Sequence, residues 1–398
     1  MGGGRSALTF GVVVALIAGV TLGNGGASVM PVFVDDFAAR FGMSDAGAGL
    51  VAAAQLMATA VLTLTLAKRA ARPGRAKMAR LGLVVAALGF LGTAWAPDEV
   101  TLILANLILG AGLGAVYAAA TAALAAADDV DRASAATVIG TVCLSALLIL
   151  AVSAANSGWG GGTGFVVMAL SCVPAWLLVR RLPDGPGSAG DAPVEAESAE
   201  SAKPSVILLI GTALLWAVTQ GAWSYASVLG REHTGMSSSA VSAVLAVSSI
   251  VALAGAVLGP VSARRFGRMR SMAAFVSGQA LAMAVLIWTR DPMLFTVAAV
   301  LWQACQLAVL VQMLAAAAVL DTSGRLVASL GGAGALGTGI GPLVVGVILD
   351  GAGAGVLSIV LAVGTFVTSF PLLRMTVASA AVARTEQAGH ETKRTTVA

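Results

Sequence analysis

Polar and aromatic side chains recur at helical spacing inside four strongly apolar stretches of the chain. Asn106 and Tyr117 share one helical face with Gly110, Gly114 and Thr121, because the successive spacings are four, four, three and four. The other three stretches carry Thr21, Asn24 and Ser28; Trp216, Gln220, Trp223 and Ser227; and Trp302, Gln303, Gln306 and Gln312. Such amides and indole rings can bind an organic solute, or they can join packed helices by hydrogen bonds. The spacing alone leaves both interpretations open.

The acidic residues lie in predicted loops, tails or helix ends, although a carboxylate inside the membrane is the usual component of a proton relay. Asp35 and Asp36 end the first apolar stretch, and Glu232 follows the seventh. These three are the proton-coupling candidates, and solvated loop charges are the alternative. Asp350 has similar status, with a solvated charge favoured. The lack of a mid-membrane charge favours a neutral or weakly charged organic solute.

The composition indicates a membrane protein. Of 398 residues, 58% are hydrophobic and 11% are charged, whereas soluble domains are about half apolar and about a quarter charged. The mean hydropathy is +0.93. These values exclude a soluble enzyme, a disordered protein and a nucleic-acid-binding protein. The 48 glycines fit closely packed membrane helices.

Residues for catalysis or metal binding are scarce. The three cysteines, Cys143, Cys172 and Cys305, are scattered through apolar runs, and the only histidines are His233 and His390. They form neither a disulfide framework nor a metal-ligand pattern. The sequence therefore predicts no enzyme, no metal site and no cofactor.

Twelve stretches are long enough to cross a bilayer core of about 30 Å, which needs about 20 apolar residues per helix. They cover residues 8–31, 46–67, 78–95, 100–124, 133–155, 162–179, 205–228, 239–260, 271–288, 293–319, 326–349 and 355–375. The sequence thus predicts an all-α polytopic membrane protein.

The lysines and arginines orient these helices. With both termini in the cytoplasm, 20 of the 23 fall in inner loops and tails, and only Arg40, Arg231 and Arg290 fall outside. This asymmetry follows the positive-inside rule. We therefore expect a multi-pass protein of a bacterial-type cytoplasmic membrane, with no nucleic-acid partner.

The chain contains an internal repeat. A shift of 193 residues places Gly42-Met43-Ser44 on Gly235-Met236-Ser237, and Trp95 and Asp98 on Trp288 and Asp291. It predicts a six-helix bundle over residues 1–182, a cytoplasmic linker over 183–204, a second six-helix bundle over 205–375 and a disordered cytoplasmic tail over 376–398.

The same shift aligns two copies of a basic loop, Ala67–Arg75 and Pro260–Arg268. Both keep an Arg-x-Gly-Arg core, formed by Arg72, Gly74 and Arg75 and by Arg265, Gly267 and Arg268. With the two parallel halves, this core resembles the inner-loop signature of the major facilitator superfamily. The family's acidic residue is replaced by Ala71 and Arg264. The resemblance implies that these loops act in gating, and it leaves the subfamily open.

The resemblance also implies alternating access around a central cavity between helices 1, 4, 7 and 10. The substrate-binding candidates on these helices are Asn24, Asn106, Tyr117, Gln220, Trp223, Trp302, Gln303 and Gln306. We expect a monomeric secondary transporter of a small organic molecule, with proton-coupled export as the first hypothesis. A facilitative or proton-symport importer of a metabolite, and a non-transporting sensor on the same fold, are the alternatives.

Overall fold

The computed structural model describes residues 9–127, 129–184, 206–321 and 325–397. Their regular structure is helical. The helices are α1 (Phe10–Gly23), α2 (Gly25–Phe41), α3 (Asp45–Ala70), α4 (Arg75–Ala94), α5 (Glu99–Leu124), α6 (Val130–Trp159), α7 (Thr163–Leu178), the 3-10 turn η1 (Val179–Arg181), α8 (Val206–Thr234), α9 (Ser238–Phe266), α10 (Arg268–Trp288), α11 (Pro292–Leu320) and α12 (Arg325–Val397).

These helices correspond to the twelve predicted stretches. Eleven helical segments of the described chain are long and apolar enough to cross a membrane. The first of them contains both α1 and α2, and the last, within α12, bends at Gly353, where the backbone φ is 75°. α12 therefore supplies the last two of the twelve stretches.

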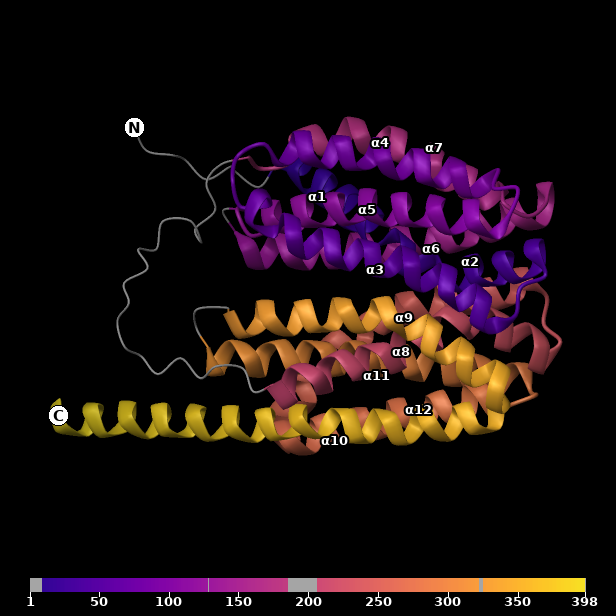
Figure 1. Cartoon of the computed structure of the whole chain (residues 1–398). Coiled ribbons are helices and arrows are strands. Elements are labelled where there is room, and N and C mark those ends of the chain that lie inside the picture. Colours follow the sequence, from indigo (N-terminus) through magenta and orange to yellow (C-terminus); the bar gives the residue numbers. More distant parts are fainter. Residues whose placement is uncertain (1–8, 128, 185–205, 322–324, 398) are drawn as a thin grey trace.

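Figure 1 shows two groups of helices side by side. Helices α1–α7 form an N-terminal group, and α8–α12 form a C-terminal group. The groups contact each other where α3 packs against α12, α6 against α9 and α2 against α8. Near the ends of α2 and α3 the two groups approach each other closely in this view (Figure 1).

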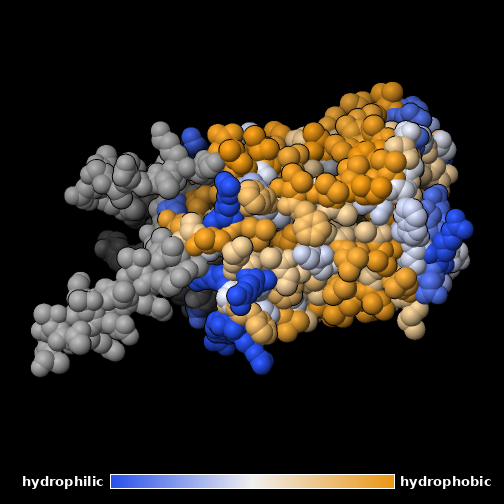
Figure 2. Space-filling view, turned by 90° about the horizontal axis from the view of Figure 1, so that it is seen from below, coloured by the Kyte–Doolittle hydropathy of each residue, from blue (hydrophilic) through white to orange (hydrophobic). Residues whose placement is uncertain are grey.

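The surface carries an apolar belt with polar residues at both ends (Figure 2). Large side chains such as Leu88, Leu147 and Val257 are exposed on helix surfaces. Only a lipid environment makes such exposure favourable over so much of a surface. The chain is a multi-pass membrane protein. We call the end with the Ala70–Arg75 turn the basic end, and the end with the Phe41–Asp45 turn the opposite end.

The structure bears differently on the predicted linker and on the predicted tail. Most of the predicted linker, residues 185–204, lies outside the described residues. The segment after Met375, predicted to be a disordered tail, is helical as far as Val397. Four of the six residues 378–383 are alanine, which has high intrinsic helix propensity, and this segment directly continues an existing helix, so no new nucleus is needed. The polar composition alone did not reveal this.

Small residues determine how closely α4 and α5 pack. A Cβ atom added at Gly112 would lie against the backbone nitrogen of Ala86 and 2.7 Å from the carbonyl oxygen of Gly82. The two helix backbones are therefore in direct contact, as small residues allow in membrane helices.

We predict that Gly112→Ala will lower the thermal stability of the purified protein by about 1–3 kcal/mol, because α4 and α5 would have to move apart. Gly158→Ala is the matched control, since a Cβ atom there meets nothing within 4 Å. Thermal unfolding of both variants in detergent measures the difference, and equal melting temperatures would contradict the packing argument.

Candidate functional site

A cavity of about 460 Å³ lies between the two groups of helices. Both groups line it: α1, α2, α3, α5 and α6 on one side, and α8, α9, α11 and α12 on the other. Its polar and aromatic lining consists of Asn24, Ser28, Thr59, Thr63, Tyr117, Thr141, Ser145, Trp216, Gln220, Trp223, Ser249, Gln303, Gln306 and Thr338. Among the described residues that line it, none carries a charge.

The N-terminal wall of the cavity is built at the break between α1 and α2. Asn24 separates the two helices, and its Nδ2 donates a hydrogen bond to Ser28 Oγ over 3.2 Å. A Cβ atom added at Gly23 would lie 2.7 Å from Tyr117 Cα, so α1 contacts α5 directly. This contact brings Asn24 and Tyr117 to the same part of the wall.

The C-terminal wall carries glutamines and tryptophans. Gln220, Trp223, Gln303 and Gln306 line the cavity, and Gln306 Oε1 is buried without a hydrogen-bond partner. Trp302 is fully buried behind this wall, with its ring 6.1 Å from that of Trp223 in an edge-on arrangement. Trp302 therefore supports Trp223, and the amides remain available to a solute.

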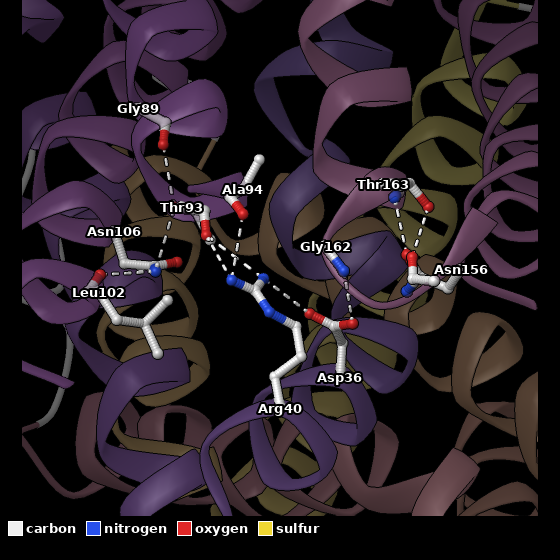
Figure 3. Close-up of polar contacts among 12 residues, drawn as sticks. Asp36, Arg40, Gly89, Thr93, Ala94, Leu102, Asn106, Asn156, Gly162 and Thr163 are labelled. Atoms are coloured by element: carbon white, nitrogen blue, oxygen red, sulfur yellow. Dashed lines mark hydrogen bonds and ion pairs between the residues drawn. The ribbon is translucent and has the colours of Figure 1, made fainter. Parts of the chain in front are cut away.

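The structure brings six of the eight substrate-binding candidates to the cavity and places Asn106 and Trp302 elsewhere. Asn106 is fully buried, and its Nδ2 donates to Leu102 O over 2.8 Å and to Thr93 Oγ1 over 3.3 Å (Figure 3). A Cβ atom at Gly114 would lie 2.5 Å from Thr59 O, so the stripe packs against a neighbouring helix there, and of its members only Tyr117 lines the cavity. The periodicity identified a face of the helix, but not which neighbour that face meets.

The sequence analysis missed the contribution of four other helices. Thr59 and Thr63 on α3, Thr141 on α6, Ser249 on α9 and Thr338 on α12 also line the cavity. Thr59 and Thr63 are one turn apart in an apolar stretch, so their spacing was a usable signal.

Polar contacts between the two groups seal the opposite end. Trp223 Nε1 donates to Ala27 O over 3.2 Å and to Ser28 O over 3.3 Å. The Tyr225 hydroxyl donates to Asp45 O, and Arg231 forms an ion pair with Asp35. Among pairs of residues that are both described, every hydrogen bond and ion pair between the groups belongs to this seal.

Asp350 completes the seal by binding the first turn of α3. Its Oδ1 accepts a hydrogen bond from Asp45 N over 3.0 Å, and its Oδ2 accepts one from Ala46 N over 2.8 Å. The first N–H groups of a helix have no partner within the helix, and the helix dipole favours a negative charge there. Asp350 is exposed, in agreement with the solvated charge that the sequence favoured, and it also ties α12 to α3 across the groups.

The three proton-coupling candidates have different surroundings. Asp36 accepts from Gly162 N over 2.9 Å and pairs with Arg40 at 3.2 Å. Arg40 also donates to Thr93 O and Ala94 O, so this cluster joins α2, α4 and the start of α7 within one group (Figure 3). Glu232 is exposed. Of the three, Asp35 is the carboxylate that pairs across the groups.

Each basic loop has a glycine with a positive φ at the basic end, although the turns differ, since ψ is 13° at Gly74 and 148° at Gly267. Gly74 and Gly267 have φ values of 107° and 88°, a region that favours glycine, which explains the Gly of each Arg-x-Gly-Arg core. Arg72 and Arg265 are exposed. The guanidinium of Arg75 is buried and donates to Ala70 O over 2.7 Å.

A carboxylate that the sequence analysis did not consider serves the first loop. Asp184 Oδ1 accepts from Gly74 N over 2.7 Å and from Arg75 N over 2.8 Å. It supplies an acidic group to the loop in which Ala71 replaces the acidic residue of the signature. In the second loop, Arg268 donates to Ser379 Oγ over 3.2 Å. These contacts join helices within one group rather than across the two.

Comparison with known proteins agrees with this architecture. The family model described as Major Facilitator Superfamily matches residues 14–320. No curated protein sequence matches the chain.

Solved transporter structures share the fold. A bacterial homologue of the human lysosomal transporter Spinster, inward-facing and unoccupied, is 17% identical with a TM-score of 0.67, over 93% of this chain and 95% of that chain. The nucleoside transporter NupG is 14% identical with a TM-score of 0.70, over 92% and 100%. The xylose transporter XylE from E. coli, partially occluded and inward open, is 15% identical with a TM-score of 0.69, over 90% and 97%.

We predict that Asp350→Asn will favour separation of the two groups at the opposite end. Loss of a carboxylate at an exposed helix N-terminus costs about 0.3–1 kcal/mol, so the separated form should increase roughly two- to fivefold. Spin labels at Trp159→Cys and Arg290→Cys, with the three native cysteines replaced by alanine, would report the separation by double electron–electron resonance.

Asp98→Asn is the matched control for this experiment. Asp98 accepts from Thr101 N over 2.8 Å at the start of α5, within one group, and these hydrogen bonds lower the pKa of its carboxyl. It should leave the distance distribution unchanged. The same shift in both variants would show that Asp350 is not a specific tie between the groups.

Proposed function

The chain belongs to the major facilitator superfamily of secondary transporters of small molecules, and on that premise we propose that it exports a neutral or weakly charged organic molecule in exchange for protons. The observation that carries the proposal is the cavity between the two groups, lined by amides, hydroxyls and indoles. Its volume of about 460 Å³ suits a small organic solute. The family's known members are transporters and not enzymes.

The lining supports the class of substrate. An anionic or cationic solute stripped of water needs an opposite charge in its site. The described lining residues instead offer amide donors and acceptors from Asn24, Gln220, Gln303 and Gln306, and an aromatic surface from Trp223. These groups fit a solute that has an apolar ring or chain and a few uncharged polar atoms.

The two groups of helices are, in this proposal, the two six-helix halves that rock around the cavity. The cross-group seal at the opposite end supports an assignment of this conformation as the state closed to the outside. The basic end would then face the cytoplasm, in agreement with the 20-to-3 distribution of lysine and arginine. Both termini would be cytoplasmic, in a bacterial-type inner membrane.

Asp35 is the coupling residue in this proposal. Its ionised carboxylate pairs with Arg231 and so stabilises the sealed state. Protonation of Asp35 removes that attraction and favours opening of the opposite end. Asp36 has a structural role, because it bonds to Arg40 and to the backbone N–H of Gly162 within the N-terminal group.

We predict that Gln306→Leu and Trp223→Ala will reduce transport at least about tenfold at unchanged expression, because each removes a group facing the solute. Gln279→Leu is the matched control, since Gln279 is buried in α10 and does not line the cavity. The measurement is retention of a panel of labelled neutral solutes in expressing cells. Normal transport by both cavity variants would contradict the site.

We also predict that a protonophore will abolish the reduced retention produced by the wild-type chain, and that Asp35→Asn will make any remaining transport insensitive to the protonophore. Glu232→Gln is the control, since it removes a nearby exposed carboxylate and leaves the Asp35–Arg231 pair intact. Uptake that survives the protonophore in the wild type would instead indicate facilitated import. Loss of coupling in Glu232→Gln alone would move the coupling role to that residue.

A further inference from the structure

The two copies of the basic loop differ in the partners of the first backbone N–H groups of the helix that follows. In the first copy, Asp184 Oδ1 accepts from Gly74 N and Arg75 N at the start of α4. Arg75 also donates to Ala71 O over 3.1 Å and to Pro183 O over 3.2 Å. The chain therefore supplies its own carboxylate to this helix N-terminus.

The second copy lacks that carboxylate. The shift of 193 residues carries Asp184 onto Val377, which lies in α12 and has no acidic group. α10 begins at Arg268 after Gly267, without a side-chain cap. Its first N–H groups and the Arg268 guanidinium thus form a positive site, and the position equivalent to Asp184 supplies no acid to it.

A separate cavity of about 310 Å³ lies at this place within the C-terminal group. Arg264, Arg268, Gln312 and Thr376 are among its lining residues. The equivalents of Arg264 and Gln312 in the first copy are Ala71 and Ala119. The second copy therefore has an additional cation and an additional amide where the first copy has two methyl groups.

The side-chain amide of Gln312 lacks hydrogen-bond partners that a ligand could supply. The residue is 6% exposed, and neither its Nε2 nor its Oε1 has a hydrogen-bond partner. Buried polar groups in native proteins are almost always hydrogen-bonded, and an amide left without partners is costly. A group that fills the cavity and bonds to both atoms of the amide would remove this cost.

We propose that this cavity binds a phosphate group that carries a hydroxylated substituent, in the place that Asp184 occupies in the first repeat. Arginine guanidinium groups and a helix N-terminus are both suited to phosphate oxygens. Gln312 Nε2 donates to the phosphate, and Gln312 Oε1 accepts from a hydroxyl of the substituent. A phosphoglycerol group has this chemistry, whether it belongs to an anionic lipid headgroup or to a free phosphate ester.

The cavity lies at the basic end, where a pocket between membrane helices is within reach of lipid headgroups and of cytoplasmic solutes. Its position therefore suits a phosphoglycerol group from a lipid as well as one from a free ester. The test uses the purified full chain in a nonionic detergent with three probes: dioctanoyl-phosphatidylglycerol, dioctanoyl-phosphatidylcholine and glycerol 3-phosphate. Binding is measured by native mass spectrometry for the lipids and by calorimetry for the free ester.

We expect phosphatidylglycerol or glycerol 3-phosphate to bind saturably, and phosphatidylcholine to bind at least about tenfold more weakly. Arg264→Ala and Gln312→Leu should each weaken binding at least about tenfold. Arg270→Ala is the matched control, because it removes an exposed arginine in the first turn of α10 that does not line the cavity. Preference for the lipid or for the free ester would identify the source.

A fourth variant separates binding from folding. Gln312→Glu places a carboxylate beside the two arginines, as Asp184 does in the first repeat. It should abolish binding and raise the melting temperature in the absence of phosphate, whereas a loss of folding would lower it. Saturable binding by Gln312→Glu, equal weakening in Arg270→Ala and Arg264→Ala, or no binding of any probe to the wild type would each overturn the proposal.

Discussion

The first turn of every helix presents backbone N–H groups that the helix itself cannot satisfy, and at the membrane boundary their partners have to come from the chain or from the surroundings. In this protein several of those partners are carboxylates. Asp98 and Asp291 cap their own helices, α5 and α11, while Asp184 reaches α4 and Asp350 reaches α3 from distant parts of the chain. The positions of these acids determine which helices are tied together and which remain free to move.

Some polar contacts stabilise one group of helices, and others hold the two groups together. The Asp36–Arg40 cluster and the Asp184 cap stabilise the N-terminal group, and all of their contacts lie within that group. Asp350 and the Asp35–Arg231 pair cross between the groups. Asp350 is exposed and the Asp35–Arg231 pair is half-buried, so water can reach these two contacts, whereas the crossing contacts of Trp223 and Tyr225 are buried. The solvent-accessible contacts of the seal therefore cost less free energy to break than the helix packing inside a group.

Hydropathy and periodicity predicted the helices well, because the bilayer requires long apolar segments whose backbone hydrogen bonds are internal. The constant shift of 193 residues aligned Gly74 with Gly267, and both glycines have a positive φ. Periodicity failed at Asn106, because a polar stripe on a helix says nothing about which neighbour it faces. The sequence also did not reveal the partners of Asp350, which are backbone N–H groups about 305 residues away and leave no mark in the local sequence.

The internal repeat allows a stronger inference than either half allows alone. The turns of the two copies differ, since ψ is 13° at Gly74 and 148° at Gly267. The first N–H groups of each following helix still need partners, so a difference in side chains between the copies has to be compensated. At the start of α4 the compensation is visible as Asp184, and at the start of α10 a cavity with Arg264, Arg268 and the unpartnered Gln312 stands in its place. A random loss of the acid would have left neutral residues, as Ala71 and Ala119 are in the first copy. The second copy instead has the added charge and amide that an external acid requires, and for that reason we attribute the asymmetry to binding rather than to drift.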